Sequence, residues 1–367
     1  MFQTIHFLYN FSTNSLDPHV DSSYVPLRAG ITETLIRLDE ENLSIEPWLA
    51  ESWDGEDGQN WTIKLREDVK FQNGKQMDAE SVKKSLERAL KENVAIQNAL
   101  KIDTISADGF THTIKTTEPF PEFISELVNP NAAIIDVSEE DFVNKPVGTG
   151  PFKLASFTPG SKLELERFDD YWDGASKLDS VTFAFNEDAN ARTLALKSGQ
   201  TDIVYRPEVE SLDSLKEDSK MKVESTATFR VHQLTMNMQR EEMKDINVRK
   251  ALDALIDRQK IVDKILLGHA ETARGRFLPS LAFAPTYDKR ETGSDEAVKH
   301  LEKAGYTLKD GKMQKDGKQL IMSMKMLLTP FVLHPSTIVA YNKDKVENRF
   351  TTKSEYYMIT NKLDVKE

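Results

Sequence analysis

Apolar residues recur along this chain with two different periods, which predict a mixture of strands and helices. Residues 61–66, Trp-Thr-Ile-Lys-Leu-Arg, alternate strictly between apolar and polar side chains, as in a strand with one buried face. The stretch from Ile5 to Tyr9 is a short apolar run with β character. Apolar residues spaced as on one face of a helix predict a helix from Pro26 to Arg37.

Three aspartates stand where helices are expected to begin. Asp78, Asp245 and Asp257 each precede an amphipathic stretch and are predicted to cap its first turn. The second stretch runs from Val248 to Leu255, and the third ends at Leu267, before Gly268, a residue type that commonly terminates helices. The strands and helices expected in the first region of the chain indicate an α+β arrangement with mixed strands.

The segment Gly148-Thr149-Gly150 precedes Pro151 and a predicted strand from Phe152 to Leu154. Closely spaced glycines also occur in phosphate-binding loops, but those loops need a helix N-terminus and usually a Lys-Ser/Thr pair. Neither follows here. We therefore interpret the segment as a structural turn in which glycine permits backbone angles that other residues avoid.

Composition narrows the class of protein. The chain has 367 residues, enough for two domains with a sizeable core. A net charge of −12 without a dense basic block argues against a nucleic-acid partner, and no apolar run approaches the length of a membrane span. The absence of cysteine excludes disulfides and thiolate chemistry. Neither H-E-x-x-H spacing nor a Ser/His/Asp ordering occurs, so an enzyme is the alternative that the sequence favours least.

Several sequence signatures occur in a fixed order. They are Leu49-Ala-Glu-Ser-Trp53, Asp68-Val-Lys-Phe71, Pro146-Val-Gly-Thr-Gly-Pro-Phe-Lys-Leu154, Tyr171-Trp-Asp-Gly174, and Val248-Arg-Lys-Ala-Leu-Asp-Ala-Leu-Ile-Asp-Arg258 with Gly268 and Ala273. The set closely resembles the extracytoplasmic solute-binding proteins, family 5, of peptide and nickel ABC importers. The resemblance implies an α/β, two-lobed periplasmic-binding-protein-like fold of type II, whose lobes close around a ligand without catalysis.

The same resemblance implies how the chain is divided between the lobes. Residues 1–237 and 329–367 are expected to form lobe one, and 238–328 a truncated lobe two. After a strand expected at 318–326, the family continues with a long helix, further strands and several helices. Here the chain passes directly into Thr329–Pro335, which resembles the return to lobe one. On the order of a hundred residues, close to a domain, are therefore expected to be missing, which leaves lobe two incomplete.

The beginning of the chain, Met1-Phe-Gln-Thr-Ile-His-Phe7, is directly strand-like. Family members normally carry a secretory signal, and Gram-positive members also a lipid-modified cysteine. The sequence is therefore expected to be a mature or engineered form without its leader, or the product of a defective gene start. The resemblance implies an extracytoplasmic location, at the cell surface or in the periplasm.

In this family the ligand lies between the lobes, against the loop after the first strand. That loop here is Ser15-Leu-Asp-Pro-His19, and imidazole is a suitable ligand for Ni²⁺. His334, in the returning segment, is the second candidate metal ligand. Nickel-binding relatives hold the ion with a small chelator, often free histidine, so the expected ligand is Ni²⁺ with a small organic chelator, and no cofactor is expected. A turn residue (His19) and a core residue (His334) are the alternatives.

Further residues are expected to contact the chelator or a peptide: Tyr24, Arg230, His232 and Asn237. A strand expected from Phe229 to Asn237 crosses towards lobe two and places Arg230 and His232 on one face. Arg230 is suited to hold a carboxylate through two parallel hydrogen bonds, and a surface ion pair is the alternative.

The favoured function is a monomeric receptor that delivers a nickel chelate to the permease and ATPase subunits of an ABC importer. Two departures from some nickel-binding relatives count against their subtype. Val128-Asn-Pro-Asn131 stands where they have Leu-Pro-Arg-Pro, and Gln97–Leu100 lacks their tryptophan. The alternatives are a nickel receptor of another subtype, an oligopeptide or dipeptide receptor, and a deletion product without transport function.

Overall fold

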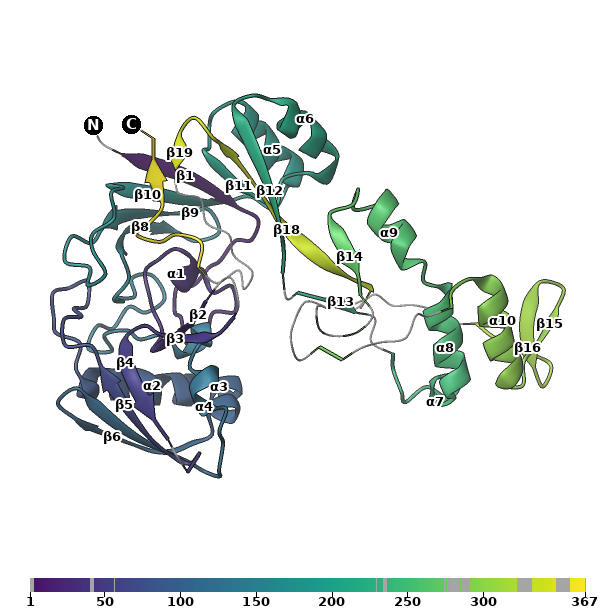
Figure 1. The fold of residues 1–367 in the computed structure, drawn as a ribbon, viewed down its shortest axis with the longest axis horizontal. Coiled ribbons are helices and arrows are strands. Elements are labelled where there is room, and N and C mark those ends of the chain that lie inside the picture. Colours follow the sequence, from purple (N-terminus) through teal and green to yellow (C-terminus); the bar gives the residue numbers. More distant parts are fainter. Residues whose placement is uncertain are drawn as a thin grey trace. The chain divides into compact units, whose positions relative to one another are not determined.

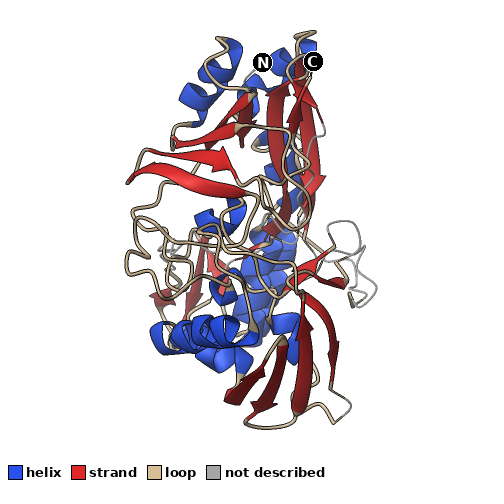
Figure 2. Ribbon diagram, turned by 90° about the vertical axis from the view of Figure 1, so that its left-hand side faces the viewer, coloured by secondary structure: helices blue, strands red, loops and turns tan. Residues whose placement is uncertain are grey.

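A computed structural model describes residues 3–39, 43–55, 57–228, 230–233, 236–273, 275, 277, 284–285, 291–321, 332–347 and 357–366. The chain divides into two compact units. Unit one comprises Met1–Thr226 and Ile338–Glu367, and unit two comprises Ala227–Thr337. The lobe boundaries expected from the sequence stay a prediction. Figure 1 labels the elements, and Figure 2 shows that helices and strands both contribute, so the fold is mixed α/β.

A mixed sheet passes through unit one in the order β12-β18-β11-β1-β10-β9-β8. β1 runs parallel to β10 and β11, whereas β9 is antiparallel to both β10 and β8. The bounds are β1 Thr4–Tyr9, β8 Phe152–Thr158, β9 Lys162–Arg167, β10 Ser180–Phe185, β11 Ile203–Tyr205, β12 Met221–Ala227 and β18 Val332–Asn342. β18 therefore begins in unit two and ends in unit one.

Aromatic side chains fill one face of this sheet. The rings of Phe7 and Phe183 stack with centroids 5.0 Å apart, and Tyr9 lies 4.9 Å from Tyr205. All four side chains are buried. On the opposite side a smaller cluster holds Leu196 of α5 (Ala189–Lys197) and Leu215 of α6 (Leu212–Glu217) against the sheet.

A second sheet of unit one is antiparallel, in the order β4-β5-β7-β6. Its strands are β4 Ala50–Asp54, β5 Asn60–Leu65, β6 Ile102–Asp108 and β7 Thr111–Thr116, and its covering helices are α2 Ala79–Glu92, α3 Val94–Leu100 and α4 Phe123–Glu126. Alternate residues of β5 are buried, as the sequence pattern predicted. Val82 and Leu86 of α2 pack in the same core as Ile63.

Short elements complete unit one. They are α1 Val25–Arg28, the strand pair β2 Ile36–Leu38 and β3 Ile45–Pro47, the pair β19 Val346–Glu347 and β20 Asp364–Val365, and the 3₁₀ turns η1 Pro130–Ala132 and η2 Val209–Ser211. The predicted helix from Pro26 to Arg37 is wrong, because the helical turn ends at Arg28. Gly30 follows with a φ of 71°, in the left-handed region that glycine tolerates.

Unit two consists of short helices and strands around a small core. Its helices are α7 Glu241–Lys244, α8 Ile246–Leu255, α9 Arg258–Lys264 and α10 Ser294–Lys303, and its strands are β13 His232–Gln233, β14 Ala270–Thr272, β15 Thr307–Lys309, β16 Lys312–Lys315 and β17 Lys318–Gln319. α8 and α10 pack on each other. β13 and β14 both pair with β18.

The predicted helix starts are confirmed. Asp78, Asp245 and Asp257 each accept a hydrogen bond from a backbone N–H of the first turn, and Asp78 forms a reciprocal pair with Ser81. The strand expected at 318–326 is described only as β17, because residues 322–331 lie outside the described part of the chain.

Candidate ligand site

The loop between β1 and α1 is shaped by hydrogen bonds between side chains and the backbone. Asp17 Oδ1 accepts a hydrogen bond from the His19 backbone N–H at 3.1 Å, the local bond that aspartate makes in turns. Asn131 Nδ2 donates to Pro18 O at 2.6 Å, and Asn93 Nδ2 donates to His19 O at 2.8 Å. Residues distant in sequence therefore fix the conformation of this loop.

The His19 side chain is fully buried, and both of its ring nitrogens have partners. Nε2 lies 3.0 Å from Ala133 O, so it carries the proton and donates. Nδ1 lies 2.7 Å from Arg88 Nη1 and accepts. Burial, together with the neighbouring Arg88 charge, lowers the pKa of His19 to about 4, so the imidazole is neutral at pH 7.

Arg88 also forms a bidentate ion pair with Asp17. Arg88 Nη1 donates to Asp17 Oδ1 at 2.9 Å, and Nη2 donates to Oδ2 at 2.5 Å. Burial by itself raises the pKa of Asp17, but the Arg88 hydrogen bond and charge outweigh it and lower that pKa below its ordinary value. Binding of a metal to His19 Nδ1 would require Arg88 to leave this nitrogen.

Tyr24, the residue before α1, has a left-handed backbone with a φ of 56°. This conformation costs a non-glycine residue about 1 kcal/mol, and such strain is concentrated at functional sites. The Arg28 guanidinium lies 5.6 Å from the ring centroids of both Tyr24 and Tyr9. The Tyr24 ring is therefore held by a cation–π contact.

The remaining predicted residues lie in unit two. Arg230 is half-buried, and its backbone N–H donates to Thr228 Oγ1 at 3.4 Å. Asn237 is exposed, and its Oδ1 accepts from the Gln239 backbone N–H at 3.0 Å. His232 is exposed on β13.

The sheet register does not place His232 and His334 opposite each other. His232 is opposite Leu333, whereas His334 is opposite Glu271 of β14. The His334 side chain lies outside the described part of the structure. Among the described residues, no group of three or more His, Asp or Glu side chains is arranged to hold a metal ion. The metal and chelator roles of His19, His334, Tyr24, Arg230, His232 and Asn237 stay predictions.

A buried carboxylate in unit one was not predicted from the sequence. Glu33 is fully buried and accepts hydrogen bonds from three uncharged donors. Thr149 Oγ1 donates at 2.7 Å, Tyr171 OH at 2.7 Å and Trp172 Nε1 at 3.2 Å. Burial raises the pKa of Glu33 to about 7, although the three hydrogen bonds oppose the rise.

Two sequence signatures therefore converge on Glu33, one around Thr149 and one around Tyr171-Trp172. The segment 148–150 was correctly interpreted as structural, but the predicted reason for its glycines is wrong. Neither Gly148 nor Gly150 has a positive φ. A Cβ on either would collide with the backbone at Gly30 or Ile31, so the glycines permit two backbone segments to touch.

The family model for bacterial extracellular solute-binding proteins, family 5 Middle, matches residues 44–348. The chain belongs to this family. The family-5 member NikA of Staphylococcus aureus, a nickel-binding protein, is 34% identical over 296 residues, which are 80% of this chain and 60% of that protein. The chain thus spans 60% of the length of the curated relatives that it matches.

Solved structures of nickel-transport proteins are also similar to this chain. A nickel ABC transporter structure from Bacillus halodurans is 52% identical with a TM-score of 0.82, and the match covers 99% of this chain and 100% of that chain. NikA from Staphylococcus aureus in complex with Ni(L-His)₂ is 25% identical with a TM-score of 0.85, with the same coverage of both chains.

The expected two-lobed family-5 fold is confirmed by these neighbours. The relatives are solute-binding proteins and not enzymes, and the family is extracellular. Within the described residues, no helix is long and apolar enough to cross a membrane. The incompleteness expected for lobe two stays a prediction.

Proposed function

We propose that this chain is the receptor of a nickel-type ABC importer and captures Ni²⁺ as a complex with a small organic chelator, such as histidine. The observation that carries the proposal is the 52% identity to the Bacillus halodurans nickel ABC transporter structure across 99% of this chain. The complex of the related NikA with Ni(L-His)₂ supports a chelated ion as the ligand. Permease and ATPase subunits on the membrane are the partners that follow, with a monomeric receptor on the extracytoplasmic side.

In this proposal His19 and His334 supply imidazole to the metal. The neutral state of His19 favours that role, because only an unprotonated nitrogen donates a lone pair to a metal. Its Nε2–H bond to Ala133 O fixes the tautomer and leaves Nδ1 as the electron-pair donor, the arrangement that carbonyl groups impose on metal-binding histidines. Ligand binding then displaces Arg88 from Nδ1.

The chelator is expected to contact Tyr24, Arg230, His232 and Asn237. Arg230 suits a carboxylate of the chelator, because a guanidinium donates two parallel hydrogen bonds to it. The strained backbone of Tyr24 supports a role for this residue in binding.

Isothermal titration calorimetry of the full chain with Ni²⁺ and L-histidine at 1:2 tests the proposal. We expect saturable binding that neither nickel nor histidine alone reproduces. His19→Ala and His334→Ala should each weaken binding at least about tenfold, the lower end of losses around metal sites. His300→Ala is the matched control, because this histidine lies on α10 with its Nε2 3.4 Å from Glu296.

The outcomes separate the parts of the proposal. Unchanged affinity in both variants would show that the two histidines are not ligands. Absence of binding to the wild-type chain, with tight binding of a short peptide instead, would replace the nickel assignment with a peptide receptor.

A further inference from the structure

The carboxyl ends of three strands meet at one edge of the mixed sheet in unit one. β1 runs parallel to both β10 and β11, so the last residues of these strands, Tyr9, Phe185 and Tyr205, lie at the same edge. In sheets with parallel strands, ligands commonly bind beyond this carboxyl edge. Arg206 is the first residue after β11, and it is half-buried, so part of it reaches the surface there.

The backbone of Arg206 is strained. Its φ is 52°, in the left-handed region that non-glycine residues rarely adopt, and Pro207 follows, although the residue before a proline prefers extended angles. Two hydrogen bonds hold this conformation. The Arg206 backbone N–H donates to Ile338 O at 2.8 Å, and Arg192 Nη2 donates to Arg206 O at 2.5 Å. Strained residues that are held in place in this way are concentrated at ligand-binding sites.

Arg192 of α5 gathers the ends of two of these strands. Its Nε donates to Tyr205 O at 3.1 Å, and its Nη1 donates at 2.6 Å to the carbonyl of Asn186, which follows β10. Burial, together with the nearby Arg206 charge, lowers the pKa of Arg192, although Asp188 opposes the change. Two guanidinium groups with interacting charges therefore lie at one edge, and a bound carboxylate would reduce their repulsion.

A series of ring contacts joins Arg206 to Tyr24, a residue proposed to contact the chelator. The Arg206 guanidinium lies 5.3 Å from the ring centroid of Tyr205, and that centroid lies 4.9 Å from the ring centroid of Tyr9. The Arg28 guanidinium lies 5.6 Å from the ring centroids of both Tyr9 and Tyr24. The two strained residues, Arg206 and Tyr24, therefore belong to one network of contacts at the carboxyl edge.

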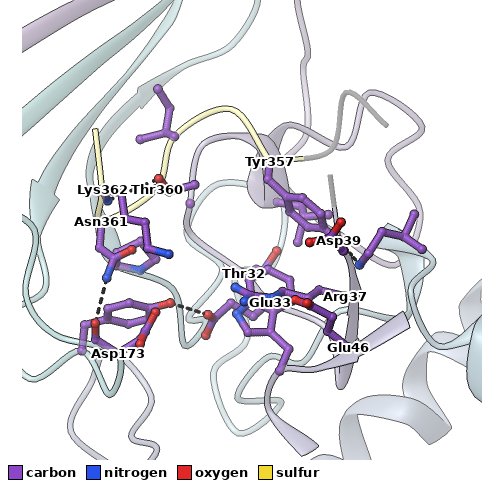
Figure 3. A pocket seen from close by; sticks show the side chains of 17 residues that line it. Thr32, Glu33, Arg37, Asp39, Glu46, Asp173, Tyr357, Thr360, Asn361 and Lys362 are labelled. Atoms are coloured by element: carbon purple, nitrogen blue, oxygen red, sulfur yellow. Dashed lines mark hydrogen bonds and ion pairs between the residues drawn. The ribbon is translucent and has the colours of Figure 1, made fainter. Parts of the chain in front are cut away.

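A pocket of about 290 Å³ in unit one, which Arg206 does not line, is less suited to an anion. Its charged lining, which Figure 3 shows, has four carboxylates and two cations: Glu33, Asp39, Glu46, Asp173, Arg37 and Lys362. Arg37 Nε already forms an ion pair with Glu46 Oε2 at 3.2 Å. The net negative lining disfavours a carboxylate ligand, so the carboxyl edge around Arg206 is the better place for one.

From these observations we propose that Arg206 donates hydrogen bonds to a carboxylate of the bound ligand and selects ligands that carry one. The inference rests on the proposed function, in which this carboxylate belongs to the nickel chelator. The terminal carboxylate of a short peptide is the same chemistry from another source. A guanidinium matches a carboxylate through two parallel N–H groups. A complex of one nickel ion with two histidines carries two carboxylates, which provides a partner for each of Arg206 and Arg230.

Isothermal titration calorimetry of the full chain with Ni²⁺ and L-histidine, and with Ni²⁺ and histamine, tests this role. Histamine keeps the imidazole and the amine of histidine but lacks the carboxylate. Arg206→Met keeps an apolar side chain and removes the charge. It should weaken binding of the histidine complex at least about tenfold, because hydrogen bonds between charged groups contribute that much. It should leave the affinity for the histamine complex unchanged, whereas damage to the fold would weaken both.

Arg167→Met is the matched control, because Arg167 lies at the opposite edge of the same sheet. Its Nη1 lies 3.0 Å from Asp179 Oδ1, and Asp179 Oδ2 accepts from the backbone N–H of Gln3, just before β1. This variant should bind both complexes as the wild type does. The inference is overturned if Arg206→Met prefers histidine to histamine as strongly as the wild type does, or if Arg167→Met loses that preference equally.

Failure of the wild-type chain to bind either nickel complex would overturn the nickel assignment instead. Arg206 is then tested with trialanine and with its C-terminal amide, which lacks the carboxylate. Loss of the preference for trialanine in Arg206→Met would support the inference with a peptide as the carboxylate source. An unchanged preference, or binding of none of these ligands by the wild type, would overturn it.

Discussion

At the scale of single residues, burial sets the protonation of Glu33, His19 and His112. Glu33 is fully buried with uncharged donors, and its pKa rises to about 7. His19 and His112 are also buried, and their pKa values fall to about 4. As the pH falls, the raised pKa of Glu33 increases the free energy of unfolding, whereas the lowered pKa values of the two histidines decrease it.

The Glu33→Gln variant isolates the carboxylate contribution. The native state takes up a proton at Glu33 near pH 7, whereas the unfolded chain does so only near pH 4.5, the ordinary pKa of glutamate. The contribution of Glu33 to the stability of the wild type therefore rises as the pH falls from 7 to 4.5. At pH 8 the ionised group costs on the order of 3 kcal/mol, from about 1.4 kcal/mol per pKa unit. We expect the stability of the Glu33→Gln variant, relative to that of the wild type, to be greater at pH 8 than at pH 5.

Urea unfolding of both proteins at a series of pH values measures this difference. The histidine contributions cancel, because both proteins contain His19 and His112 and lose stability together as the pH falls from 6.5 towards 4. A difference in the free energy of unfolding that is the same at pH 5 and pH 8 would contradict the raised pKa.

At the scale of elements, local signals predicted much of the fold. Asp78, Asp245 and Asp257 cap helices because their side-chain oxygens accept hydrogen bonds from first-turn backbone N–H groups that have no partner within the helix. This interaction is local, so the sequence predicts it. The alternation of β5 directly reflects its one buried face.

The sequence pattern predicted the wrong conformation where contacts between distant segments determine the backbone. Leu27, Ile31 and Leu35 are all buried, as expected, but the segment after Arg28 is irregular and buried on all sides instead of being a helix with one buried face. Gly30 turns the backbone here, and a Cβ on it would lie 2.7 Å from Ile359 O. Glu33 went unpredicted because its partners lie 116–139 residues away in sequence.

Gly150→Ala tests the close contact between the two segments. The added Cβ would overlap the Gly30 backbone carbonyl, which cannot rotate away, so we expect a loss of about 2–3 kcal/mol in the free energy of unfolding. Gly74→Ala is the control, because its Cβ would meet nothing within 4 Å and only the left-handed φ of 87° opposes it. That strain costs about 1 kcal/mol. Equal losses in the two variants, measured by urea unfolding, would refute the contact argument.

At the scale of the whole molecule, the two units differ in how well their cores are filled. The buried cluster of unit two around α8 and α10 consists largely of alanines, whereas unit one buries many large aliphatic and aromatic side chains. Large apolar residues of unit two are exposed, among them Ile246 at 53%, Leu255 at 54% and Ile265 at 64%. Among the described residues, the buried cluster around α8 and α10 therefore has smaller apolar side chains than the clusters of unit one, and their burial contributes less to stability.

We expect unit two to open before unit one. Hydrogen–deuterium exchange of the full chain should show amides of α8 and α10 exchanging at least tenfold faster than those of β5 and β7, because local stability follows buried apolar contact. The two sets lie in regular hydrogen-bonded elements, which makes the comparison direct. Equal protection of the two sets would contradict the difference between the cores.

The central claim is that this chain is a receptor for a nickel chelate. Thermal unfolding of the purified chain, with and without nickel plus L-histidine, tests it most directly. A ligand that binds only the native state stabilises it by about 2.7 kcal/mol at a hundredfold excess over Kd. The account predicts a cooperative transition that moves to higher temperature only when nickel and histidine are present together. A cooperative transition at an unchanged temperature would contradict it.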